Sequence, residues 1–204
     1  MTDLGDRYEE HHRERRDEGD FVFVPERIPL FRASIGTGKR VLDLGCRSGA
    51  LTRHLLDGNE VVGVDVDPAA LAKAAALGIE PVQANVEEPL PFDDESFDAV
   101  VAGELLEHLQ FPDALVAEVR RVLRPGGVLV GSVPNAFRLQ SRLRFLRGRP
   151  PEDDPTHLRM FSPDAMRALL RGFRDVRLDY VGGRYRRLHP RLLARDLAFS
   201  AVRP

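Results

Sequence analysis

The stretch Val41-Leu42-Asp43-Leu44-Gly45-Cys46-Arg47-Ser48-Gly49 decides the fold of this chain. Its first four residues are mostly apolar and Gly45 follows them, which is typical of a buried strand that ends in a tight turn. Leucines at helical spacing come next, with Ser48 as a suitable cap and Gly58 as a stop. We therefore predict a strand, a turn and a helix in this order.

The same alternation continues along the chain. Further strand patterns are short apolar runs at residues 61–64, 79–84, 97–102 and 128–133. Helix patterns lie between them, most clearly at 68–77 and 112–123, and two last strands, 176–181 and 197–202, predict a terminal hairpin. This order favours an α/β fold. We expect a Rossmann-like, doubly wound sheet of seven strands, mostly parallel, with an antiparallel C-terminal hairpin.

The composition is that of a globular protein. Of the 204 residues 43% are hydrophobic and the formal net charge is −2, so a single domain is expected over residues 1–204. Within it we expect a helical arm or lid (1–34), a cofactor-binding core (40–133), and substrate-side loops with the terminal strands (134–204).

Cysteine usage and hydropathy exclude several classes of protein. A single cysteine excludes an internal disulfide and a cysteine-based zinc cluster, and we predict no metal site. The first residues lack the apolar core of a signal peptide, and no apolar run is long enough to span a bilayer. We therefore expect a cytoplasmic protein.

Charge is divided unevenly along the chain. Residues 1–135 carry 14 Lys or Arg and 25 Asp or Glu, whereas residues 136–204 carry 16 and 7. The basic part can meet an anionic ligand or surface, or the two parts can neutralise one another. Within it, residues 136–148 combine an apolar stripe with arginines. In order of preference, this stripe packs on the sheet, receives an anionic substrate or lies on an anionic membrane surface.

The turn after the first strand has the features of a nucleoside site. Gly45 and Gly49 let the backbone approach a ligand closely, and the N–H groups of the next helix can meet its polar groups. Asp65 ends the second strand 20 residues after Gly45, where an acid can bridge two ribose hydroxyls. The G-x-G-x-x-G pattern and the Gly-Lys-Ser/Thr pattern are absent, which argues against dinucleotide and triphosphate sites.

Five ordered motifs resemble the class I S-adenosylmethionine-dependent methyltransferases, with similarity to the methyltransferase-11/23 and MetW-like branches. Residues 41–49 resemble motif I, V-L-D-x-G-C-G-x-G. The other four follow in the family's order: Val62-Gly63-Val64-Asp65, Pro89-Leu90-Pro91-Phe92-Asp93-Asp94-Glu95-Ser96-Phe97-Asp98, Glu107-His108-Leu109 and Leu123-Arg124-Pro125-Gly126-Gly127. Pro134-Asn135 and His157-Leu158-Arg159-Met160-Phe161-Ser162 continue the similarity more faintly.

The resemblance implies S-adenosylmethionine as cofactor and S-adenosylhomocysteine as its product. By position, Asp43 and Gly45 would flank the methionine part, and Asp65 would hold the ribose. The remaining cofactor residues would be Cys46 and Gly49 in the turn, Val66, Asn85 and Val86 around the adenine, and Gly103, Glu104 and Leu105 near the sulfonium. Arg47 replaces a glycine of motif I, and Asn85 replaces a frequent aspartate. Both departures weaken the expected cofactor site without excluding it.

Two histidines are candidates for a catalytic base. His108 follows the fourth strand near the expected methyl group, and His157 lies in a proline-bounded loop that can close over the site. The alternative for His108 is a helix-start histidine that bonds the backbone. Glu104 and Glu107 would orient a histidine, bind substrate or be solvated. Tyr8 is a further candidate to cover the cofactor.

The leading hypothesis is methyl transfer from S-adenosylmethionine to an oxygen or nitrogen of a small molecule, with an anionic acceptor as one option. The alternative is a MetW-like partner or regulatory protein without catalysis. No nucleic acid partner is expected, because the chain has no Trp, three Tyr and a net negative charge. Membrane-surface contact is not favoured, and a monomer and a homodimer both stay open.

Overall fold

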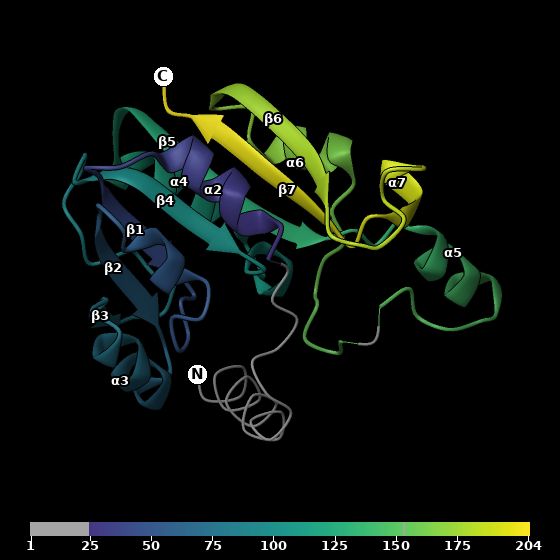
Figure 1. Cartoon of the computed structure of the whole chain (residues 1–204), viewed down its shortest axis with the longest axis horizontal. Coiled ribbons are helices and arrows are strands. Elements are labelled where there is room, and N and C mark those ends of the chain that lie inside the picture. Colours follow the sequence, from purple (N-terminus) through teal and green to yellow (C-terminus); the bar gives the residue numbers. More distant parts are fainter. Residues whose placement is uncertain (1–24, 153) are drawn as a thin grey trace.

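The computed structural model describes residues 25–152 and 154–204, and it contains a twisted sheet of seven strands (Figure 1). The strands are β1 (Arg40–Leu44), β2 (Glu60–Asp65), β3 (Glu80–Gln83), β4 (Phe97–Gly103), β5 (Leu123–Pro134), β6 (Arg174–Val181) and β7 (Asp196–Val202). Their order is β3-β2-β1-β4-β5-β7-β6. β1 to β5 pair in parallel, whereas β7 is antiparallel to both β5 and β6. The predicted fold class is confirmed.

Helices cover both faces of the sheet. They are α2 (Arg27–Ile35), α3 (Pro68–Ala76), α4 (Pro112–Val122), α5 (Leu139–Leu146), α6 (Pro163–Leu169) and α7 (Pro190–Leu193), with 3₁₀ turns η2 (Thr52–Leu55) and η3 (Leu106–His108). Local chemistry explains where several begin. Proline occupies the first turn of α3, α4, α6 and α7, and the Asp67 carboxylate accepts N–H groups at the start of α3.

Side chains along each strand alternate between two apolar cores. Val41, Val61 and Val101 pack with α2 and α3 on one face. Leu42 and Val100 pack with α4 and α6 on the other. The parallel strands β1, β2, β4 and β5 end at the same edge, which we call the carboxyl edge. The strand order reverses there between β1 and β4, which is where sheets of this kind bind ligands.

The predicted helix after the first strand is wrong. Turns occupy the chain as far as Leu51, and only the 3₁₀ turn η2 follows, without a side-chain cap from Ser48. The N–H of Gly49 donates to the Cys46 carbonyl at 2.9 Å, and that of Arg53 to the Gly49 carbonyl at 2.9 Å. No α-helix N-terminus therefore faces a ligand here.

The expected N-terminal arm lies largely outside the described residues, and so do Tyr8 and its predicted role. Within residues 25–152 and 154–204, no helix is long and apolar enough to cross a membrane.

Candidate active site

The turn after β1 ties three strand ends together at the carboxyl edge. The N–H groups of Gly45 and Cys46 both donate to the Val64 carbonyl, at 2.8 and 3.0 Å. A Cβ on Gly45 would lie 3.2 Å from Leu105 Cδ1, so the turn also contacts the chain that leaves β4. Gly45 itself needs its positive φ of 71°, which favours glycine. The structure therefore brings predicted cofactor residues from three segments together.

The Asp65 carboxyl has the acceptor capacity that a ribose requires. It is 7% exposed at the end of β2. Its Oδ2 accepts the Arg47 N–H at 2.9 Å and its Oδ1 accepts the Asp67 N–H at 3.0 Å. A carboxylate offers about four lone-pair positions, so each oxygen can accept one more donor. Two ribose hydroxyls would fit this requirement, and the residues present therefore suit the expected cofactor.

Packing within the protein accounts for Gly49. Its φ is +78°, and a Cβ there would lie only 2.5 Å from Ile79 Cδ1. The adjacent Cys46 is 6% exposed and its side chain is part of the core that contains Val41. Burial and, to a smaller extent, the charges of Asp43 and Asp65 raise the pKa of the Cys46 thiol. Gly49 and the Cys46 side chain thus support the turn from inside rather than face a ligand.

Arg47 is exposed, and its backbone has a φ of +50°. This left-handed conformation suits glycine and explains why motif I has one at this position. The Arg47 N–H still holds Asp65 in place. The substitution therefore leaves the geometry of the turn intact.

Asp43 is buried beneath the turn at 4% exposure. The Thr52 hydroxyl donates to its Oδ2. Burial raises the pKa of Asp43 to about 7, and the neighbouring Asp65 adds to the shift, whereas the Thr52 hydrogen bond opposes it.

The residues predicted to contact the adenine are half-buried or exposed. Val66 and Val86 are half-buried, and Asn85 is exposed. The Asn85 Oδ1 already accepts the Glu87 N–H at 3.0 Å. Only the remaining lone pair of this oxygen could meet an adenine amino group.

A buried ionic group follows β4 at the carboxyl edge. Gly103 is half-buried, and Glu104 has a strained φ of +55°. Arg27 donates to Asp196 Oδ2 through Nη2 at 2.8 Å and Nε at 3.2 Å, and its Nη2 lies 3.2 Å from Glu104 Oε1. Arg27 and Asp196 are each 4% exposed. Burial raises the pKa of Glu104 to about 7, although the Arg27 charge opposes this.

Glu107 is the most unusual acid of the structure. It is 1% exposed, and neither carboxyl oxygen has a hydrogen-bond partner within the described parts of the chain. Burial, followed by the nearby Glu104, raises the pKa of Glu107 well above its ordinary value. The expectation of a solvated carboxylate is wrong here, because η3 turns this side chain inward.

The two candidate catalytic histidines are neighbours. The rings of His108 and His157 meet edge to face, with centroids 4.8 Å apart. Glu152 Oε2 lies 2.5 Å from His157 Nδ1. Thr156 contacts His108 Nδ1 through its carbonyl at 3.2 Å and its hydroxyl at 3.1 Å. Burial lowers the pKa of His157, but the Glu152 hydrogen bond and charge outweigh it and raise the value overall.

The sequence around His157 explains how this loop reaches the site. The N–H groups of Leu158 and Arg159 donate to the Glu107 carbonyl, at 2.8 and 3.1 Å. The Arg159 side chain donates to the Leu109 and Gln110 carbonyls. Phe161 is buried in the core and Ser162 caps α6. The H-x-R-x-F-S pattern therefore fixes His157 beside His108, although 49 residues separate them.

Comparison with known proteins also supports a site for S-adenosylmethionine. Residues 42–131 match the family model described as a methyltransferase domain. A ubiquinone biosynthesis O-methyltransferase of Hahella chejuensis is 37% identical over 120 residues, which are 55% of this chain and 48% of that protein. A probable S-adenosylmethionine-dependent methyltransferase of Mycobacterium tuberculosis is 36% identical over 145 residues, 69% of this chain and 50% of its own.

The chain therefore contains a methyltransferase domain and is similar to class I S-adenosylmethionine-dependent methyltransferases. The fold agrees. A solved structure from Thermotoga maritima, described as a possible histamine N-methyltransferase, aligns with a TM-score of 0.76 at 17% identity and full coverage of both chains. The chain spans about half the length of the curated relatives it matches.

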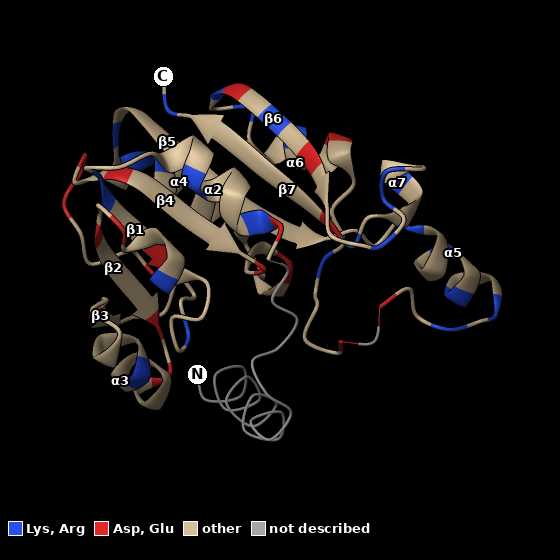
Figure 2. Ribbon diagram, in the orientation of Figure 1, with Lys and Arg blue, Asp and Glu red and all other residues tan. Residues whose placement is uncertain are grey.

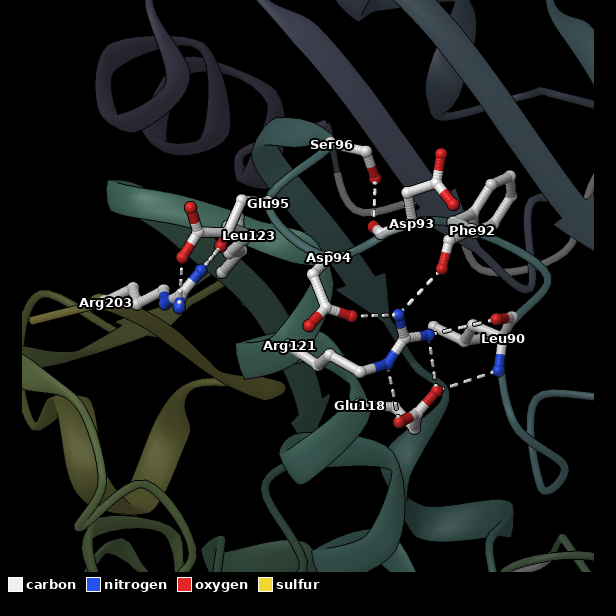
Figure 3. A network of polar contacts seen from close by, with 10 residues as sticks. All are labelled: Leu90, Phe92, Asp93, Asp94, Glu95, Ser96, Glu118, Arg121, Leu123 and Arg203. Carbon is white, nitrogen blue, oxygen red and sulfur yellow. Dashed lines mark hydrogen bonds and ion pairs between the residues drawn. The ribbon is translucent and has the colours of Figure 1, made fainter.

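Residues of the 89–98 motif form a network of polar contacts with α4 (Figure 3). Arg121 of α4 donates to the Leu90 and Phe92 carbonyls and pairs with Asp94 and Glu118. The carboxylates of Asp94 and Glu118 thus accept hydrogen bonds from the Arg121 guanidinium. This network holds the loop before β4 in place.

The arginine-rich helix α5 does not pack its apolar stripe on the sheet, so the preferred interpretation is wrong. Figures 1 and 2 show α5 beyond the end of β5, with Lys or Arg along it. Phe137, Leu139 and Leu143 are 40–43% exposed, and Leu146 is 79% exposed. The other two interpretations stay predictions.

Proposed function

We propose that this protein transfers a methyl group from S-adenosylmethionine to an oxygen or nitrogen of a small molecule at the carboxyl edge. One observation carries the proposal. The edge joins an Asp65 carboxyl with spare acceptor capacity to a group after β4 that contains the buried Glu107 and the half-buried His108 and His157. The first suits a nucleoside and the second suits an acceptor that loses a proton.

The cofactor would lie over the turn after β1. Asp65 would accept the ribose hydroxyls, the backbone around Gly45 would face the methionine part, and Val66 would flank the adenine. When bound, S-adenosylmethionine supplies an electrophilic methyl group, whose bond to sulfur breaks as the acceptor atom attacks, so that S-adenosylhomocysteine leaves. The residues of the edge then have to align the acceptor and exclude water.

The acceptor would lie beside His108 and His157. A hydroxyl acceptor gives its proton to an imidazole, and Glu152 orients the His157 ring for this step. The name of the Hahella chejuensis relative, an O-methyltransferase, supports oxygen as the acceptor atom. Arg138 and Arg195 act on Asp196 electrostatically, so positive charge lies near the group. This supports an anionic acceptor.

A transfer experiment tests the proposal without knowledge of the acceptor. Protein is incubated with S-adenosylmethionine labelled in the methyl group and a filtered extract of small metabolites. We expect label in a small molecule, and a rate about 100-fold lower for His157→Asn. Label only in protein or nucleic acid, or none with a folded protein that binds S-adenosylhomocysteine, would overturn it.

A further inference from the structure

Three side chains that commonly bind metals converge at the carboxyl edge. Each of Glu107, His108 and His157 offers one ligand atom, and these atoms all lie within 4.8 Å of one another. We propose that the three residues bind a divalent transition-metal ion. The sequence by itself predicts no metal site. His157 is distant in sequence from Glu107 and His108, and backbone contacts of its loop to the Glu107 carbonyl bring it close.

The donor set indicates the class of metal. Two imidazoles and one carboxylate suit Zn²⁺, Mn²⁺, Fe²⁺ or Co²⁺ and leave coordination positions open for an exogenous ligand. Ligand atoms around such an ion lie about 3–4 Å apart, given bonds of about 2.0–2.2 Å. Small rotations of the three side chains are therefore sufficient to reach this geometry.

The Glu107 side chain provides independent support for a cation. A buried carboxyl with no hydrogen-bond partner is costly, and both of its oxygens are in this state within the described parts of the chain. The nearby guanidinium of Arg27 is engaged by Asp196 and Glu104 instead. A divalent ion would supply the charge and the bonds that these oxygens lack.

The surroundings of the histidines also fit ligands. Metal-binding imidazoles commonly hold a carboxylate or carbonyl on their second nitrogen, which orients the first toward the ion. Glu152 occupies this position at His157 Nδ1, and Thr156 occupies it at His108 Nδ1. Asp154 Oδ1 accepts the Thr156 hydroxyl at 2.6 Å and steadies this contact.

The ion would give the edge a chemical role beyond that of a base. With the metal bound, His108 and His157 are ligands, and an acceptor hydroxyl on an open position loses its proton more easily because of the cation. This role rests on the proposed methyl transfer, whereas the site itself does not.

Binding of the metal alone tests the site. Untagged protein of residues 1–204, freed of metal by a chelator, is titrated with Zn²⁺ by calorimetry and with Co²⁺ by visible absorption, without cofactor or acceptor. We expect one ion per chain and the absorption bands of Co²⁺ bound by nitrogen and oxygen. His157→Asn and Glu107→Gln should each weaken binding more than about 100-fold.

A control variant carries a matched change at a histidine outside the three proposed ligands. The exposed His189→Asn should leave the affinity unchanged. Thermal melting checks that each variant is folded. Folded wild type that binds neither ion, or binding that survives both Glu107→Gln and His157→Asn, would overturn the site. Because no methyl transfer is measured, failure here is distinct from failure of the proposed function.

Discussion

Two polar regions at opposite ends of β4 differ in how their charged groups are paired. Before β4, the Arg121 network matches each carboxylate with a guanidinium or an N–H group. After β4, Arg27 pairs with Asp196 and approaches Glu104, while both oxygens of Glu107 lack a partner among the described residues. Paired groups hold the fold, whereas unpaired buried acids are tolerated where a ligand completes them.

The difference also separates two kinds of motif. The residue 89–98 motif anchors the loop before β4, because its polar groups are bonded by Arg121. The Glu107-His108 motif and His157 direct polar groups into a shared space instead. Four substitutions, from the largest expected effect to the smallest, test this contrast and the turn after β1.

Asp43→Asn should have the largest effect, a change in how the free energy of unfolding depends on pH. Burial raises the pKa of this carboxyl to about 7 in the folded protein from 3.8. Between about pH 4 and pH 7 the folded state keeps a proton that the unfolded chain has lost, so the free energy of unfolding falls as pH rises. Asp43→Asn should remove this loss, which is about 4 kcal/mol at pH 8 and near zero at pH 4. Urea unfolding of both proteins across this range measures the difference. An equal loss of stability with rising pH in Asp43→Asn and in wild type would show that Asp43 does not cause it.

Arg121→Ala should destabilise the fold by about 3 kcal/mol, because several buried or half-buried acceptors lose their donor together. The affinity for S-adenosylhomocysteine of the folded molecules should not change. Denaturant unfolding and calorimetry measure the two quantities. The exposed neighbour Arg120→Ala is the control, and a loss of cofactor affinity without a loss of stability would reverse the contrast.

Glu107→Gln should make the metal-free protein more stable by about 1 kcal/mol near neutral pH, because burial forces Glu107 to take up a proton on folding and a neutral amide does not have this cost. Methyl transfer should fall at the same time. Unfolding in the presence of a chelator provides the stability measurement. A variant less stable than wild type would mean that Glu107 is already satisfied in the folded protein.

Arg47→Gly should have the smallest effect. Glycine relieves the left-handed backbone at φ +50° but adds freedom to the unfolded chain, so we expect a change within about 0.5 kcal/mol. The exposed side chain contributes little to the site, so the dissociation constant for S-adenosylhomocysteine should stay within about twofold. A tenfold tighter variant would show that Arg47 obstructs the cofactor.

Sequence was sufficient for the strands and for the order of the motifs. Valine and leucine runs such as 61–64 are buried on both faces, which leaves a clear local pattern. The pairing of Arg27 with Asp196, 169 residues away, leaves no such pattern. His108 and His157 were each identifiable, but their contact depends on backbone bonds to the Glu107 carbonyl. The sequence did not predict the burial of Glu107 either, because a side chain in a turn after a strand can face the core or the solvent.

Calorimetry with S-adenosylhomocysteine tests the central claim, that the carboxyl edge is a cofactor and reaction site, most directly. Wild type should bind one molecule per chain. Asp65→Ala should bind about 10- to 100-fold more weakly, because hydrogen bonds to a charged group contribute about 1.5–3 kcal/mol each. Asp65→Asn, which keeps the size of the side chain, should fall between them, and the exposed control Asp113→Ala should match wild type. No heat with folded wild type, or equal affinity in Asp65→Ala, would contradict the account.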